Sequence, residues 1–148
     1  MIDCVREYVD RVRVSRPEIN KLVINSDNGP ECSGKRTQWL KRLLQLSQEK
    51  NILIDLVYYP PYHSKYNPVE RLWGILENHW RGEIIDSVNK AIGLAKTVTF
   101  NAVSPVVSLV GTLYKKGIKL TSKKMKLIES SLIRKPGLEK YFISIFPN

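Results

Sequence analysis

The sequence predicts an α/β fold in which two parallel strands alternate with helices. Two runs, residues 2–14 and 39–47, carry apolar side chains at helical spacing. Two shorter runs, residues 21–26 and 52–59, are rich in β-branched and other apolar residues and end at turn-forming residues. With 148 residues, 43% of them hydrophobic, the chain is long enough to bury a core.

The first predicted element is an amphipathic helix over residues 2–14, which ends before the Ser15-Arg16-Pro17 break. Asp3 and Asp10 lie two turns apart on its polar side, and we interpret them as part of a solvated helix face.

The first predicted strand, residues 21–26, stops at a strong turn signal, Asp27-Asn28-Gly29-Pro30. A helix follows, with Trp39, Leu40, Leu43 and Leu44 on its apolar side, and then a second strand over residues 52–59. The order strand, helix, strand predicts a parallel pair, because such a crossover returns the chain in the same direction.

A third helix begins after an irregular loop. Asn67 is a good N-cap residue, Pro68 occupies the first helical position and Glu70 the third. The side chains expected to form its buried stripe are Val69, Leu72, Trp73, Leu76 and Trp80.

Two carboxylates, Asp27 and Glu70, follow the carboxyl ends of the two predicted strands. Each has a plain structural alternative: Asp27 could close an Asx turn, and Glu70 could complete a capping box with Asn67. Both nevertheless fall on the sheet edge where open α/β sheets bind ligands. Mg²⁺ or Mn²⁺ prefers such oxygen ligands, and a pair of metal ions can stabilise an in-line phosphoryl displacement.

The charge balance indicates a polyanionic partner. The chain has 24 Lys and Arg against 14 Asp and Glu, a formal net charge of +10, so DNA or RNA is the leading candidate. Its two cysteines, Cys4 and Cys32, form no CxxC pair. With no apolar stretch as long as a membrane span and no signal-like amino terminus, the expected location is the cytoplasm, with no membrane partner.

Two sequence blocks carry a family resemblance. Asp27-Asn28-Gly29-Pro30-Glu31 and the segment from Tyr59 to Arg71, which contains Asn67-Pro68-Val69-Glu70, resemble the second and third catalytic blocks of insertion-sequence transposases. The chain is most similar to the Rhodopirellula-type DDE transposases. The similarity continues through residues 73–80, 119–121 and 136–140.

The resemblance implies a partial ribonuclease-H-like fold, made of the last two parallel strands with flanking helices. It further implies that Asp27 and Glu70 are the second and third of three acids that bind two Mg²⁺ or Mn²⁺ ions for DNA cleavage and strand transfer. The family's first aspartate belongs on an earlier strand, whereas Asp3 and Asp10 lie on the helix just before Asp27. We therefore expect a carboxyl-terminal fragment that is inactive alone and whose open sheet edge causes marginal stability or self-association.

We divide the chain into residues 1–96, belonging to the catalytic domain, and residues 97–148, a basic and mainly helical appendix packed on it. Residues 115–140 contain nine basic and two acidic residues. These bases could contact a DNA backbone, or they could form the solvated face of a small helix around residues 122–133. The candidate DNA-binding residues are Lys115, Lys116, Lys119, Lys123, Lys124 and Lys126.

Four residues near the two acids are candidates for the active-site rim or for contact with a phosphate: Asn28, His63, Lys65 and Asn67. Two functions remain open at this point. The chain could be a nuclease and strand-transferase half-site that needs a missing segment. Alternatively, it could be a non-catalytic DNA-binding or assembly remnant that modulates a full-length transposase.

Overall fold

The computed structural model describes residues 1–60, 66–114, 117–118 and 120–147. The chain divides into two compact units, Met1–Tyr62 with Gly117–Asn148, and His63–Lys116. Residues 117–148 thus belong to the same compact unit as the amino-terminal part of the chain.

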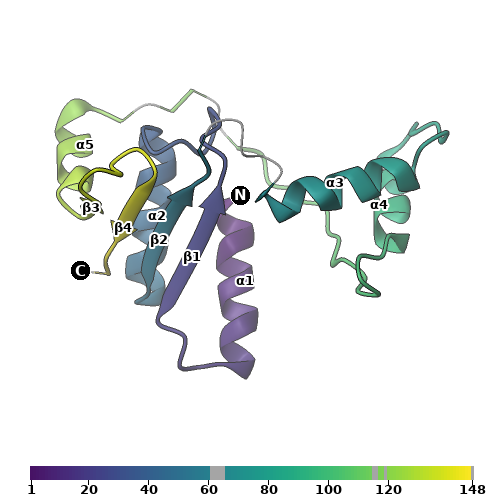
Figure 1. Cartoon of the computed structure of the whole chain (residues 1–148), viewed down its shortest axis with the longest axis horizontal. Coiled ribbons are helices and arrows are strands. Elements are labelled where there is room, and N and C mark those ends of the chain that lie inside the picture. Colours follow the sequence, from purple (N-terminus) through teal and green to yellow (C-terminus); the bar gives the residue numbers. More distant parts are fainter. Residues whose placement is uncertain (61–65, 115–116, 119, 148) are drawn as a thin grey trace. The chain divides into compact units, whose positions relative to one another are not determined.

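The first unit contains a four-stranded mixed sheet and three helices (Figure 1). The amino-terminal part supplies α1 (Ile2–Ser15), β1 (Lys21–Ser26), α2 (Thr37–Lys50) and β2 (Leu53–Tyr58). The carboxyl-terminal part supplies α5 (Ser122–Glu129), β3 (Leu132–Arg134) and β4 (Phe142–Ile145). The two helices and two strands predicted before residue 60 are thus confirmed.

The sheet has the strand order β1-β2-β4-β3. β1 and β2 are parallel, as predicted, while β4 lies antiparallel to both β2 and β3. The expectation of a mainly helical carboxyl-terminal part is wrong here, since only α5 is helical within residues 120–147. β4 is a short strand that gains stability by pairing with β2, a partner distant in sequence, and the still shorter β3 pairs with β4.

One face of the sheet forms the core. Paired residues of neighbouring strands, such as Ile54 with Ile145 and Leu56 with Ile143, point toward the helices and are completely buried. α2 contributes most of the opposing surface, and Figure 1 shows it behind the sheet. The buried residues of α2 are Trp39, Leu40, Leu43, Leu44, Leu46 and Ser47.

The opposite face of the sheet is more polar. Asp55 lies in its centre with its carboxylate buried, and it accepts a 2.6 Å hydrogen bond from Ser144 Oγ. Lys21 Nζ forms a 2.7 Å ion pair with the other carboxylate oxygen. Val23 and Ile133, on the same face, remain 50% and 57% exposed.

β1 is an edge strand, as the sequence predicted. The amides of Leu53 and Tyr59 donate to the carbonyls of Asn20 and Ser26, so the even-numbered residues of β1 face β2. The backbone groups of the odd-numbered residues therefore point away from the sheet. An apolar groove of about 480 Å³ runs along this edge, lined by residues of α1 and β1: Met1, Cys4, Val5, Tyr8, Leu22, Val23, Ile24 and Asn25.

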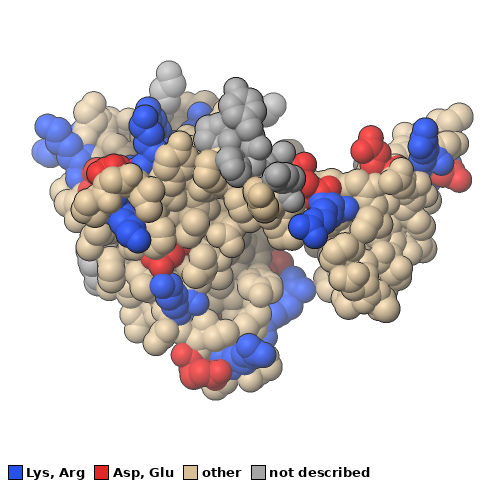
Figure 2. Space-filling view, in the orientation of Figure 1, with Lys and Arg blue, Asp and Glu red and all other residues tan. Residues whose placement is uncertain are grey.

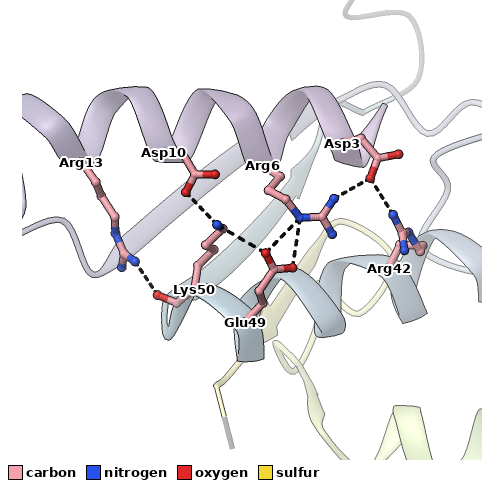
Figure 3. Close-up of polar contacts among 7 residues, drawn as sticks. All are labelled: Asp3, Arg6, Asp10, Arg13, Arg42, Glu49 and Lys50. Atoms are coloured by element: carbon pink, nitrogen blue, oxygen red, sulfur yellow. Dashed lines mark hydrogen bonds and ion pairs between the residues drawn. The ribbon is translucent and has the colours of Figure 1, made fainter. Parts of the chain in front are cut away.

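The α1–α2 contact is polar as well as apolar (Figure 3). Asp3 accepts a 2.7 Å hydrogen bond from Arg42, and Asp10 forms a 2.7 Å ion pair with Lys50. Arg6 Nε lies 3.0 Å from Glu49 Oε2. Asp10 is exposed, as expected for a solvated helix face, although it pairs with Lys50. Asp3 departs from that expectation, because it is half-buried and pairs with Arg42 of α2.

The second unit contains α3 (Pro68–His79) and α4 (Val88–Thr97), whose carboxyl ends are joined by a 2.9 Å hydrogen bond between His79 Nε2 and Thr97 Oγ1. The prediction that α3 has a buried apolar stripe is wrong, since no residue of the helix is buried and Trp73 is 60% exposed. No helix in the described part of the chain is long and apolar enough to cross a membrane.

Candidate active site

Asp27 follows the last residue of β1 and is exposed to solvent. β1 and β2 end together, because Ser26 pairs directly with Tyr58 in the parallel register. The segments after the two strands therefore leave the sheet at the same edge, as the sequence predicted.

The loop after β1 holds Asp27 through polar contacts. Ser26 Oγ donates a 2.9 Å hydrogen bond to the Asp27 carbonyl, and the Cys32 thiol lies 3.3 Å from the same oxygen. The thiol is also 3.5 Å from Asp27 Oδ1. Burial is the main reason why the pKa of Cys32 is raised above its ordinary value.

Two buried aromatic side chains anchor this loop to the core. Tyr58 donates a 2.7 Å hydrogen bond from its hydroxyl to the carbonyl of Cys32, and Trp39 Nε1–H donates to the Tyr58 oxygen at 3.2 Å. Burial raises the pKa of Tyr58 to about 12, so its hydroxyl remains a donor at neutral pH.

The far end of the loop contacts the carboxyl-terminal strands. Arg134 Nη2 donates a 2.9 Å hydrogen bond to the carbonyl of Gly34. A Cβ at residue 34 would lie 2.9 Å from Ile143 Cδ1 and 3.3 Å from the Tyr58 ring, so the loop packs against the core at a position that only glycine fits without rearrangement.

Asn28 is exposed and serves the loop itself, since its Oδ1 accepts a 3.4 Å hydrogen bond from the amide of Gly34. Gly29 lies next to the carboxylate, since a Cβ at this position would be 3.4 Å from Asp27 Oδ2. An exposed carboxylate suits a hard divalent cation that keeps several water ligands.

Glu70 lies in the first turn of α3 and is exposed. The predicted helix start is confirmed: Asn67 Oδ1 accepts a 3.2 Å hydrogen bond from the amide of Val69, and Pro68 occupies the first helical position. The positive end of the helix dipole interacts favourably with negative charge at this point.

Asp27 belongs to the first compact unit and Glu70 to the second. Among the residues that the structure describes, no group of three or more His, Cys, Asp or Glu side chains could hold a metal ion. Among the other candidates, Lys123, Lys124 and Lys126 are exposed on α5. Five predicted site residues lie outside the described residues: His63, Lys65, Lys115, Lys116 and Lys119.

The contacts that Cys32 and Tyr58 make with the Asp27 loop were not predicted from the sequence. The only local signal was a cysteine five residues after the aspartate. The position of Tyr58 at the end of β2 gives no indication of its bond to Cys32, which depends on how the strand and the loop pack.

One family model matches residues 1–147 of the chain, and it is described as the Rhodopirellula transposase DDE domain. No curated protein and no solved structure matches the chain.

Proposed function

Because the chain belongs to the family of the Rhodopirellula transposase DDE domain, we propose that it provides two of the three carboxylates of a transposase active site. Asp27 and Glu70 act as oxygen ligands for Mg²⁺ or Mn²⁺ in DNA cleavage and strand transfer. The observation that carries this proposal is the in-register end of β1 and β2, with Asp27 immediately after one strand and Glu70 in the first helix after the other.

DNA cleavage and strand transfer require little of these two residues beyond their position and their negative charge. When bound, the metal ions would stabilise the attacking and leaving oxygens of the phosphodiester. Asp27 presents its carboxylate from a loop anchored to the core, while Glu70 presents its carboxylate from the first turn of α3. Both side chains are exposed and can therefore reach a DNA phosphate and its metal ions.

A third carboxylate completes the site in this proposal, and it comes from a further polypeptide segment that adds a strand beside β1. The backbone groups of Lys21, Val23 and Asn25, which point away from the sheet along that edge, support this, as does the apolar groove next to them. Without that segment the chain does not cleave DNA, because two carboxylates leave a pair of dications without a bridging ligand.

DNA is the partner that the family implies, and α5 is the proposed contact surface. Its three exposed lysines follow the N-cap Thr121, while Ile128 near the end of the helix packs into the core. Figure 2 shows basic side chains gathered over the α5 end of this face. Phosphate contacts by these lysines would make binding fall steeply as salt rises.

Metal-dependent nicking of a supercoiled plasmid tests the catalytic proposal. The chain is assayed with Mg²⁺ or Mn²⁺, alone and together with the polypeptide encoded immediately upstream in whichever frame supplies an aspartate-bearing strand. We expect nicking only from the combination, and we expect Asp27→Asn and Glu70→Gln each to abolish it. Glu77→Gln, an exposed position two turns further along α3, is the matched control and should retain activity.

Equal nicking by the wild type, Asp27→Asn and Glu70→Gln would refute the catalytic assignment. The alternative function is a non-catalytic DNA-binding or assembly remnant that modulates a full-length transposase, and the exposed lysines of α5 favour it. That alternative predicts no nicking in any combination. It also predicts DNA binding that survives both acid substitutions and is weakened by Lys123→Ala with Lys124→Ala.

A further inference from the structure

A relay of buried hydrogen bonds connects α2, β2 and the Asp27 loop. It begins at Trp39 Nε1–H, passes through the hydroxyl of Tyr58 at 3.2 Å and ends at the carbonyl of Cys32, 2.7 Å further on. All three residues are buried. Since a buried polar group without a partner is costly, each member of the relay restricts the position of the next.

Cys32 in turn restricts the position of Asp27. Its backbone is held by Tyr58, and its amide donates a 3.3 Å hydrogen bond to the carbonyl of Gly29 inside the loop. Its thiol lies 3.3 Å from the Asp27 carbonyl oxygen and 3.5 Å from Oδ1 of the carboxylate. The sulfur therefore limits movement of both the backbone and the side chain of Asp27.

We propose that Cys32 is a positioning residue for the Asp27 carboxylate, and that Tyr58 holds Cys32 in place. This role rests on the proposed function of Asp27 as a metal ligand. The Cys32 thiol lies beside Oδ1 of the carboxylate, while the Asp27 side chain as a whole is exposed to solvent. A ligand held in one orientation before the metal arrives binds it more tightly than a mobile one.

The test uses variants that each remove one hydrogen-bonding group. Tyr58→Phe removes the hydroxyl and keeps the ring, while Cys32→Ala removes the thiol. Ser47→Ala is the matched control, because Ser47 is also buried and its hydroxyl donates to the carbonyl of Ile52 at 2.6 Å. The hydroxyl of Ser47 lies in the core between the carbonyls of Ile52 and Ile145, so its variant reports the effect of general destabilisation.

The first measurement is amide hydrogen exchange of residues 27–34 under native conditions, compared with exchange in the central residues of β2. We expect Tyr58→Phe and Cys32→Ala to accelerate exchange in the loop by about tenfold or more, while exchange in β2 changes little. The loss of about one hydrogen bond lowers the free energy of local opening by an amount that corresponds to this factor. Cys32→Ser should restore part of the protection, since its hydroxyl can still donate. Loop exchange that rises no more than in Ser47→Ala would overturn the positioning role.

The second measurement is Mn²⁺ binding, followed by the relaxation of water protons, with Mn²⁺ alone as the probe. Loss of an outer partner of a metal ligand typically weakens binding by about 10–100-fold, and we expect that range for Tyr58→Phe and Cys32→Ala but no change for Ser47→Ala. If Asp27→Asn leaves Mn²⁺ binding unchanged, the proposed function fails. Loop exchange then still decides whether Cys32 and Tyr58 fix the loop.

Discussion

The two helices that follow the parallel strands differ in how they are packed. α2 buries six residues against the sheet, whereas α3 buries none in the structure, although both sequences have apolar side chains at helical spacing. Asp27 is therefore held by a loop connected to a packed core, while Glu70 is held mainly by its own helix start. Apolar residues at helical spacing show that one side of a helix can be buried. Whether that side is buried depends on a second surface for it to pack against.

The largest expected difference between the two helices is in the free energy of unfolding. Leu43→Ala in α2 removes a completely buried side chain and should cost about 2–5 kcal/mol. Trp73→Ala removes a side chain that is 60% exposed and should change stability by less than about 0.5 kcal/mol. Urea unfolding of both variants measures the two values. A large cost for Trp73→Ala would break the comparison, because it would mean that the α3 stripe is covered in solution.

A smaller effect is expected at the start of α3, where local capping replaces packing. Asn67→Ala removes the acceptor of the Val69 amide and should destabilise the helix by about 1 kcal/mol. Hydrogen exchange in the first turn of α3 should accelerate accordingly. Ser87→Ala removes the equivalent cap of α4, where the serine accepts from the amide of Lys90, and should leave α3 unchanged. Equal exchange in α3 of wild type and Asn67→Ala would contradict a locally specified helix start.

The smallest effect concerns pH and the ion pairs between α1 and α2. The hydrogen bond from Arg6 lowers the pKa of Glu49 below its ordinary value of 4.5. A carboxylate whose pKa is depressed by folding stabilises the protein above its unfolded pKa, and this contribution is lost as the pH falls through the folded value. Glu49→Gln should therefore be less stable than wild type near neutral pH, by at most about 1 kcal/mol because the pair is partly exposed.

That deficit of Glu49→Gln should shrink as the pH falls below about 4.5. Chemical unfolding at a series of pH values measures it, with Glu77→Gln on α3 as the control in the less packed unit. A stability difference between wild type and Glu49→Gln that grows on acidification would have the wrong sign and would remove the role assigned to Arg6.

The amino acid sequence by itself determined the local elements. Apolar spacing predicted α1 and α2, β-branched runs predicted β1 and β2, and Asn67 with Pro68 predicted where α3 begins. These features depend on interactions between residues close in sequence, so the pattern contains them. The positions of Asp27 after β1 and Glu70 in the first turn of α3 followed for the same reason.

Only the tertiary structure decided the rest. β3 and β4 have three and four residues, too few for a clear period. β4 becomes a strand because β2 offers a partner distant in sequence, and β3 because β4 then offers its other edge. The ion pairs of Asp3 with Arg42 and of Asp10 with Lys50 could not be predicted, because they depend on how α1 packs against α2. The bond from Tyr58 to Cys32, which anchors the Asp27 loop, likewise depends on packing between distant segments and has no signature in the sequence.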